Sequence, residues 1–208
     1  EELSEHGGEY RLRLGVLPLF GSQRLIPRLP ELRKRYPKLH IDVVTSGHAE
    51  NLLGDTVDAA IIIAAEVDPK LYSVRLDTNH IYAIAARTLA EESQIKAPSD
   101  LEGHTVLVHS EMPAIFDVWK AAIGQPRLRP ASLDQMDSGP MILEAAAQGL
   151  GIAIMHGSDF SDAKDPRLTR LFDIEVDSPY SYWFVCRERA LQQRAVRIFH
   201  DWLVAANV

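Results

Sequence analysis

The sequence is poor in cysteine, lacks long apolar runs and has no excess of positive charge. Cys186 is the only cysteine in 208 residues, which excludes an internal disulfide and a cysteine-clustered zinc site and fits a reducing cytosol. No apolar run approaches the roughly 20 residues that span a bilayer, and the acidic, polar N-terminus is unlike a signal peptide. The formal net charge of −7 disfavours direct contact of this segment with nucleic acid phosphates. We therefore expect a cytoplasmic protein that neither is exported nor enters a membrane.

Signatures of catalysis are also missing. The sequence contains no G-x-S-x-G, Walker, G-x-G-x-x-G or H-E-x-x-H motif. His109 and Ser110 are adjacent in a predicted strand, so their side chains point to opposite faces, which disfavours a catalytic pair. His104, His109 and His156 do not have the spacing of metal ligands. These absences predict a protein that is not an enzyme and has no metal and no cofactor.

What is present begins with alternating polar and apolar residues at 11–16, which predict a strand. Ser22 follows as the predicted N-cap of a helix that ends before Pro37, with a kink at Pro30 or a late start near Pro27. A strand at 39–44, a short helix at 49–53 and a buried strand at 58–63 come next. The first part of the chain therefore predicts a βαβαβ unit.

A second βαβαβ unit is predicted further along. Residues 71–86 hold two β-rich runs, of which the second leaves the first sheet. The unit itself then comprises a strand at 105–108, a helix at 114–123, a strand at 131–136, a helix at 141–148 and a strand at 149–155. The chain ends with a strand at 182–187 and an amphipathic helix around residues 195–203.

The expected fold class is α/β, with two Rossmann-like βαβ subdomains joined by two crossover strands. We expect the crossings near residues 84–87 and 156–159, which gives subdomain I as 11–84 and 160–208 and subdomain II as 85–159. Residues 1–10 read as a lead-in segment. Because ligand pockets favour the cleft between two lobes, a small-molecule site is expected there.

Five short motifs, in this order and spacing, resemble the effector-binding domain of LysR-type transcriptional regulators. They are Leu25-Ile26-Pro27-Arg28-Leu29, Tyr36-Pro37, Val57-Asp58-Ala59-Ala60-Ile61, the run of residues 145–154 (AAAQGLGIAI), and Phe199-His200-Asp201-Trp202-Leu203. The resemblance covers residues 11–206 and is greatest to the glycine-cleavage-activator branch. It implies a fold like that of type 2 periplasmic binding proteins. It also implies an N-terminal winged helix-turn-helix and linker helix, which this chain lacks, so we expect residues 1–5 to be a remnant of that linker helix beside a cut.

The resemblance also implies a ligand pocket lined by the loops that follow the strands of both lobes. On this sequence the implied ligand-binding residues are Phe20, Gly21, Ser22, Gln23, Thr45, Ser46, Gly47, Ile63, Ala64, His109, Ser110, Asp137 and Ser138.

Several of these residues also have purely structural interpretations. Ser22 and Ser138 are explained equally by helix capping and by a pair of caps that offers hydroxyl and N–H groups to an anion. His109 is either a partner of the effector or a buried histidine with satisfied hydrogen bonds, and Phe20 is either a wall of the pocket or a cover for the core. Cys186 is interpreted as an inert buried thiol, with redox sensing as the alternative.

The sequence thus predicts a cytoplasmic effector-sensing domain that binds a small carboxylate or zwitterionic ligand. Its partners are expected to be copies of itself in a homodimer or tetramer, and DNA only through the absent winged helix. The arginines at 187, 189, 194 and 197 form a basic streak near the C-terminal helix, which is either a solvated face or part of that subunit interface. The alternative function is a free-standing solute-binding protein of a transport system.

Overall fold

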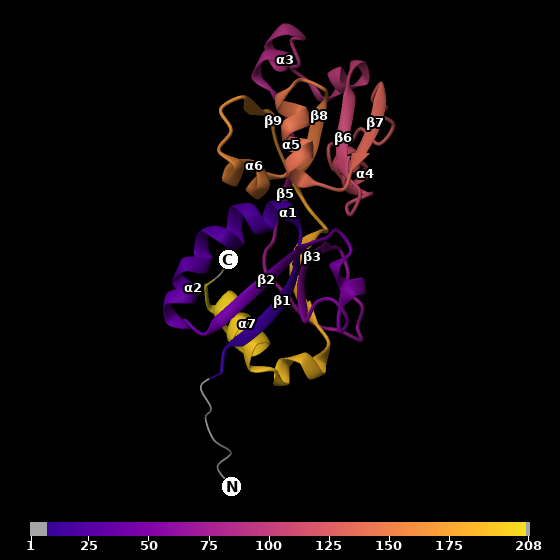
Figure 1. Cartoon of the computed structure of the whole chain (residues 1–208). Coiled ribbons are helices and arrows are strands. Elements are labelled where there is room, and N and C mark those ends of the chain that lie inside the picture. Colours follow the sequence, from indigo (N-terminus) through magenta and orange to yellow (C-terminus); the bar gives the residue numbers. More distant parts are fainter. Residues whose placement is uncertain (1–7, 207–208) are drawn as a thin grey trace.

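The computed structural model describes residues 8–206 as two α/β lobes, one above the other in Figure 1. Each lobe is built on a five-stranded sheet, with strand orders β2-β1-β3-β10-β4 and β7-β6-β8-β5-β9. The first lobe contains both the beginning and the end of the described chain (Figure 1). The predicted fold class is confirmed, whereas the predicted linker-helix remnant at residues 1–5 lies outside the described residues.

Parallel pairing at the centre of each sheet accounts for the two βαβ units. The strands of the first sheet are β1 (Tyr10–Val16), β2 (Leu39–Thr45), β3 (Ala59–Ala64), β4 (Tyr72–Arg75) and β10 (Ser181–Cys186). Those of the second sheet are β5 (His80–Ala86), β6 (Thr105–His109), β7 (Ser132–Met136), β8 (Ile152–His156) and β9 (Leu168–Asp177). β1 runs parallel to β2 and β3, and β6 runs parallel to β7 and β8. The remaining strands pair antiparallel with their neighbours: β10 lies between β3 and the edge strand β4, and β5 lies between β8 and the edge strand β9.

Helices cover both faces of the two sheets. The α-helices are α1 (Pro18–Phe20), α2 (Leu29–Arg35), α3 (Arg87–Glu92), α4 (Ile115–Ala122), α5 (Gly139–Ala147), α6 (Gly157–Ala163) and α7 (Arg194–Ala206). Shorter helical segments are η1 (Gly21–Leu25), η2 (Ile26–Arg28), η3 (Ala49–Leu52), η4 (Pro98–Gly103) and η5 (Glu188–Gln192). Alternate residues of β6 and β8 pack against α4 on one face of the second sheet and against α5 on the other.

The helix after β1 begins earlier than the sequence predicts. Pro18 occupies the first turn of α1, where its missing N–H removes no hydrogen bond, and Leu17 is the N-cap residue. Ser22 lies inside the helical run, and its hydroxyl donates to the carbonyl of Leu19 at 3.2 Å. The N-cap role predicted for Ser22 is therefore wrong. The run continues through the π turn η1 and the 3-10 turn η2 to α2, so the chain accommodates Pro27 and Pro30 by changing its helical hydrogen-bonding pattern.

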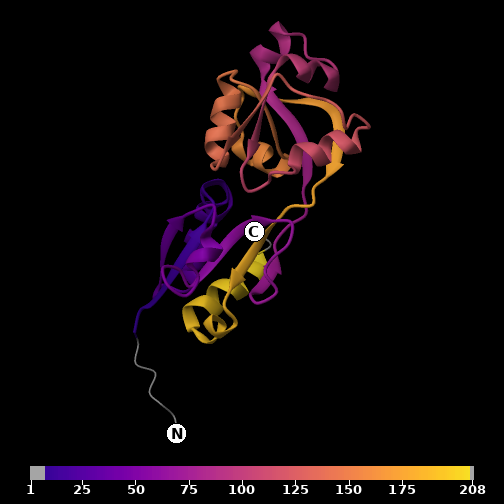
Figure 2. The ribbon, with the colours of Figure 1, turned by 90° about the vertical axis from the view of Figure 1, so that its right-hand side faces the viewer.

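The chain passes between the lobes at positions other than those expected. β4 belongs to the first sheet and β5 to the second, so the first crossing is at residues 76–79 rather than 84–87. β9 pairs with β5, which places the return crossing at 178–180 rather than 156–159. The expected assignment of residues 80–84 and 160–177 to the first lobe is corrected, because backbone pairing holds them in the second sheet. Figure 2 shows the two crossing segments side by side at the waist of the molecule.

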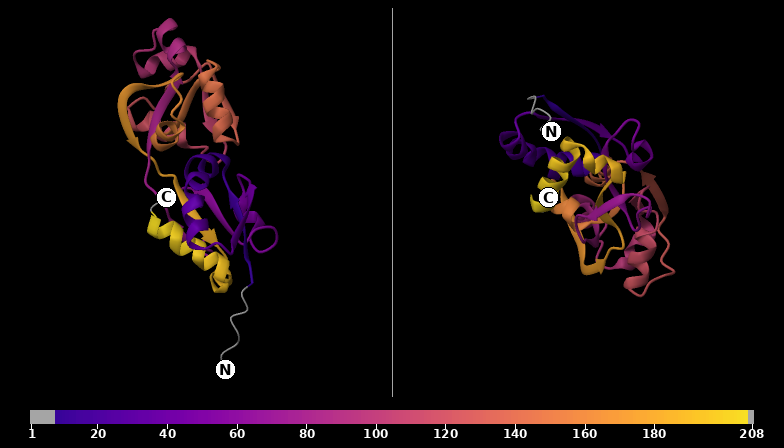
Figure 3. Two further views of the ribbon diagram at one scale, coloured as in Figure 1. Left: turned by 60° about the vertical axis from the view of Figure 1, so that its left-hand side comes forward. Right: turned by 90° about the horizontal axis from the view of Figure 1, so that it is seen from below.

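A continuous apolar core runs through both lobes. One cluster joins Leu14 and Phe184 of the first sheet with Val108 and Ile154 of the second. α7 packs against the first sheet through Phe199 and other apolar residues, as its amphipathic pattern predicts, and Figure 3 shows it along one side of the lower lobe. Among residues 8–206 no helix is both long and apolar enough to cross a membrane.

Candidate functional site

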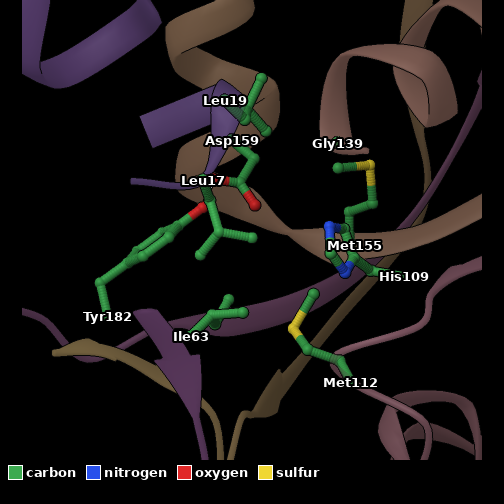
Figure 4. A pocket seen from close by; sticks show the side chains of 9 residues that line it. All are labelled: Leu17, Leu19, Ile63, His109, Met112, Gly139, Met155, Asp159 and Tyr182. Atoms are coloured by element: carbon green, nitrogen blue, oxygen red, sulfur yellow. Dashed lines mark hydrogen bonds between the residues drawn. The ribbon is translucent and has the colours of Figure 1, made fainter. Parts of the chain in front are cut away.

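A small pocket lies where the carboxyl ends of the parallel strands of both lobes meet. Leu17, Leu19, Ile63 and Tyr182 line it from the first lobe. The second lobe contributes His109, Met112, Gly139, Met155 and Asp159. We call this the inner pocket (Figure 4). The parallel βαβ topology explains its position, since the loops that follow parallel strands gather at one edge of each sheet.

Side chains fill most of the inner pocket. The remaining space is about 10 Å³, which is enough for roughly one water molecule. Most of the lining is apolar, and two of the residues that fill the space are methionines, whose unbranched side chains adapt easily to new shapes. A larger ligand therefore requires the lobes to separate or these side chains to move.

A buried ionic cluster adjoins the inner pocket. Arg24 Nη1 donates to Asp77 Oδ2 at 2.9 Å, and the two side chains are only 13% and 15% exposed. The other oxygen of Asp77 accepts from the backbone N–H of Tyr182 at 2.8 Å. The Arg24 guanidinium also lies over the rings of Phe20 and Tyr182, 5.5 and 5.1 Å from their centroids. This cluster fixes the first lobe to the start of the crossing segment.

Asp159 brings a second carboxylate to this cluster from the other lobe. The side chain is 3% exposed, and Tyr182 Oη donates to its Oδ1 at 3.4 Å. Burial and the neighbouring carboxylate of Asp159 hold the pKa of Tyr182 well above its usual value, so the hydroxyl stays protonated. Arg24 is attracted to both Asp77 and Asp159.

His109 offers a hydrogen-bond donor to the inner pocket. Its Nδ1 accepts from the backbone N–H of Glu111 at 3.1 Å, so the proton of the neutral ring must be on Nε2. The residue is 4% exposed, and no hydrogen bond of Nε2 to a described residue is formed. Burial lowers the pKa of His109, an effect that Asp137 opposes, and the ring is neutral near pH 7.

A second buried histidine lies behind the pocket and contacts the crossings. His156 is fully buried, and its Nε2 is 2.8 Å from Ser178 Oγ. Burial lowers its pKa to about 4, with Arg24 and His109 acting in the same direction and Asp77 against it. Ser178 also donates its backbone N–H to the carbonyl of Asn79 at 2.9 Å, which joins the two crossing segments. The second lobe thus contacts the return crossing directly and the first crossing through Ser178.

A wider hollow, which we call the cleft mouth, shares Ile63 with the inner pocket. It has a volume of about 330 Å³ and extends from the end of β3 to Glu111 of the second lobe. Its described lining contains four acidic residues, Glu50, Glu66, Asp68 and Glu111, and neither lysine nor arginine. Glu50 Oε2 is buried without a hydrogen-bond partner. Burial raises the pKa of Glu111 above its usual value, and the nearby carboxylate of Glu50 also raises it. His48 opposes these effects, since its Nε2 lies 3.3 Å from Glu111 Oε1.

The structure brings only some of the predicted site residues to these hollows. Ile63 and His109 line the inner pocket, and Ile63 and Ala64 line the cleft mouth. Phe20 and Gly21 are buried in the helical run, and the ring of Phe20 packs against Tyr182 at 4.8 Å. Ser22, Thr45 and Asp137 are exposed, whereas Gln23, Ser46, Gly47 and Ser110 are partly buried. Ser138 is the N-cap residue of α5, as predicted, although its side chain makes no capping hydrogen bond.

Two polar residues of the inner pocket, Asp159 and Tyr182, were not predicted from the sequence. Asp159 lies in the first turn of α6, directly after β8, and the family resemblance placed the other candidates in loops that likewise follow strands. Because a crossing between the lobes was expected at residues 156–159, Asp159 was not predicted as a site residue. Tyr182 lies within an apolar strand pattern, and only the pairing of β10 with β3 brings it to the cleft.

Other sequence candidates lie away from the site. Cys186 is fully buried, and burial raises the pKa of its thiol to about 11, which favours the inert interpretation over redox sensing. Arg187, Arg189, Arg194 and Arg197 are exposed around η5 and α7. Among the side chains that the structure describes, no three of His, Cys, Asp or Glu converge as a metal site.

Comparison with known proteins agrees with this architecture. The family model of the LysR substrate binding domain matches residues 5–207. The glycine cleavage system transcriptional activator of Escherichia coli K12 is 24% identical over 206 residues, which cover 98% of this chain and 67% of that protein. The transcriptional activator AmpR of Pseudomonas aeruginosa is 27% identical over 202 residues, or 95% of this chain and 67% of AmpR.

Solved structures show the same fold. The effector domain of AmpR from Pseudomonas aeruginosa superposes with a TM-score of 0.83 at 24% identity, covering 96% of this chain and 95% of that one. The AmpR effector binding domain from Citrobacter freundii gives a TM-score of 0.82 at 24% identity, covering 96% and 98%. Since the family model spans nearly the whole chain, this protein belongs to the LysR substrate-binding domain family, the effector-binding domains of LysR-type transcriptional regulators.

Proposed function

We propose that this chain is the sensing domain of a LysR-type regulator and that its effector is a small molecule bound in the inner pocket. The observation that carries the proposal is the composition of that pocket, in which residues of both lobes surround one space with buried polar groups on either side. A ligand that contacts both lobes binds one relative orientation of them more tightly than others, and so shifts their equilibrium.

The volume of the inner pocket supports a mechanism that depends on lobe movement. With about 10 Å³ free, the present arrangement has no room for a ligand larger than water. The two crossing segments, together with Leu19, Met112 and Met155, are the parts that must adjust when an effector enters. Binding energy is thereby coupled to the angle between the lobes, which is the quantity a regulator transmits.

The remaining parts of the proposal concern partners and location. DNA contact is assigned to a winged helix-turn-helix outside this chain, and the regulator is assigned to the cytoplasm. Self-association as a dimer or tetramer is supported by the exposed edge strand β2 and by Ile26 and Val43, which are 51% and 40% exposed on the first lobe. Sedimentation velocity of this chain before and after Arg194→Glu and Arg197→Glu tests whether α7 takes part.

The experiment that tests effector binding is a thermal-shift screen with a library of water-soluble metabolites, followed by calorimetry on the compounds that stabilise the chain. Ile63→Phe and Met155→Phe fill the inner pocket from opposite lobes and should abolish the stabilisation. Leu150→Phe is the matched control, because Leu150 is 65% exposed on the second lobe and away from the pocket. Compounds that bind both filled variants as tightly as the parent chain would place the effector elsewhere.

A second experiment separates the sensing domain from the solute-binding alternative. The DNA upstream of the region that encodes this segment should continue in frame into a winged helix. An open reading frame that starts at this segment, beside genes for a transporter, would support the alternative instead.

A further inference from the structure

A separate hollow lies on the second lobe, beside the first crossing. We call it the hinge hollow, and its volume is about 390 Å³. Its described lining consists of residues 78–80 and 82 at the first crossing and in β5, residues 157, 158, 160 and 161 of α6, and Arg170 of β9. α6 packs against β5, and Figure 1 shows both just above the waist of the molecule. The hinge hollow shares no described lining residue with the inner pocket or the cleft mouth.

Two residues that line the hinge hollow carry a buried hydrogen-bond donor without a partner. The first is Asn79, which is 7% exposed. Ser158 Oγ donates to its Oδ1 at 2.6 Å, whereas its Nδ2 forms no hydrogen bond with a described residue. The second donor is Nε of Arg170, which is buried and unbonded in the same sense. Because buried polar groups almost always have a partner, two such donors in the wall of one hollow indicate a place for the acceptor group of a ligand.

The surroundings of the Arg170 guanidinium favour a negatively charged acceptor. Its Cζ lies 3.8 Å from the centre of the Tyr82 ring, and its Nη2 donates to the carbonyl of Ile174 at 3.2 Å. Its ion pair with Asp173 is long, at 3.7 Å, and that carboxylate is fully exposed, so the pair contributes little. The ring and the backbone therefore hold the guanidinium in place, and a carboxylate can accept a charge-assisted hydrogen bond from Nε.

The charges around the hinge hollow suit a ligand with a single negative charge. The described lining contains Arg170 and His80 but no aspartate or glutamate. Glu175 and Asp177, the acids beside His80, lie 3.4 and 3.2 Å from its Nε2 and so already have a partner. These two carboxylates disfavour a ligand with several negative charges, because like charges repel.

We propose that the hinge hollow binds a small organic acid, whose carboxylate accepts from Asn79 Nδ2 and Arg170 Nε. The volume lies in the range of small-molecule sites, and Phe160 and Tyr82 add apolar contacts for the body of the ligand. Asn79 belongs to the first crossing, and its backbone carbonyl accepts from Ser178 of the return crossing. A ligand that joins Asn79 to Arg170 therefore restrains the crossings against the second lobe, whether or not an effector occupies the inner pocket.

NMR of the ¹⁵N-labelled chain tests the site. The probes are four monocarboxylates (butyrate, hexanoate, benzoate and phenylacetate) and, for each acid, the neutral amide of the same shape. At least one acid should shift the backbone amide signals of Asn79 and Arg170, and its amide should bind about tenfold more weakly, since it lacks the charge that Arg170 recognises. Failure of all four acids to shift these signals, or equal binding of each acid and its amide, overturns the proposal.

Two variants locate the bound acid. Arg170→Lys keeps the positive charge but lacks Nε, and it should weaken binding about tenfold. Ser161→Trp fills the hinge hollow from an exposed position and should abolish binding without removing a buried group. Unchanged binding in either variant overturns the proposal.

Two control variants should bind the acid as the parent chain does. Arg129→Lys changes an exposed arginine that precedes β7, at the opposite edge of the sheet from β9. Ile63→Phe fills the inner pocket and leaves the hinge hollow unchanged. Loss of binding in Ile63→Phe would place the acid in the inner pocket, which refutes the second site and leaves the proposed function standing.

Discussion

Removal of Asp77 should destabilise the protein far more than removal of an exposed acid with similar ion-pair geometry. Asp77 accepts from Arg24 at 2.9 Å and from the backbone N–H of Tyr182 at 2.8 Å. Asp77→Ala leaves a buried guanidinium short of one partner and a buried N–H without any. Breaking a buried ion pair costs about 3–5 kcal/mol, and here Asp159 and two aromatic rings still stabilise Arg24. We therefore expect a loss of about 3 kcal/mol.

The matched control is Asp42→Ala. Arg11 Nη1 lies 2.7 Å from Asp42 Oδ1, but these side chains are 60% and 50% exposed. Such pairs contribute less than about 1 kcal/mol. Asp77→Asn separates the ion pair with Arg24 from the hydrogen bond with Tyr182. The amide oxygen of the asparagine still accepts from the Tyr182 backbone N–H, but the negative charge is lost. The free energy of unfolding of Asp77→Asn should therefore be about 1 kcal/mol higher than that of Asp77→Ala.

Urea denaturation followed by tryptophan fluorescence gives the free energy of unfolding of each variant. In thermal melts, a loss of 3 kcal/mol corresponds to a decrease of roughly 6–12 °C for a chain of this length. If Asp77→Ala proves as stable as Asp42→Ala, the buried cluster does not hold the crossing segment to the first lobe.

Two further predictions concern the same region. The pKa of His156 is about 4 in the folded protein and about 6.5 when unfolded, so the unfolded chain binds the proton first as the pH falls. The contribution of this histidine to the free energy of unfolding is complete above pH 6.5 and is lost between pH 6.5 and 4, by about 3 kcal/mol in total. Urea titrations at several pH values should show that the free energy of unfolding declines less in His156→Gln than in the parent chain. An equal decline would contradict the lowered pKa of His156. A Cβ atom added at Gly139 would lie 2.8 Å from Leu19 Cδ2 across the lobe interface. Gly139→Ala should lower the free energy of unfolding by about 1–3 kcal/mol, and by less when Leu19 is also replaced by alanine. The control Gly103→Ala should leave stability unchanged, because a Cβ atom there meets nothing within 4 Å. An equal loss with and without Leu19→Ala would exclude the contact between Gly139 and Leu19.

Local patterns were reliable wherever one face of an element is buried. The strands expected at residues 11–16 and 105–108 agree with β1 and β6 to within one residue. A strand buried on one face shows alternating polar and apolar residues, and a strand buried on both faces shows a continuous apolar run. α4 likewise follows from the helical spacing of Ile115 and Trp119. The sequence pattern does not predict a strand at residues 168–177, where β9 is found. A positive φ at Phe172 and a register shift against β5 interrupt the alternation that would have marked this strand.

The position of the two hollows was easier to predict from the sequence than the residues that line them. The rule that ligands bind beyond the carboxyl ends of parallel strands agrees with Ile63, Ala64 and His109, which the family resemblance implied and which line the two hollows. It failed for Ser22, because Pro18 starts the helix one turn earlier. It missed Tyr182, which is on an antiparallel strand that returns from the other lobe.

The sequence by itself indicated the two βαβ units and the family, because each strand, helix and family motif is a short run of neighbouring residues. Tertiary structure alone decided where the chain crosses between the lobes, which strands close each sheet, and which charges meet at the pocket. Arg24, Asp77, Asp159 and Tyr182 are separated by up to 158 positions, and nothing local to any of them indicates the others. Their shared environment exists only because two distant crossing segments bring the halves of the chain together.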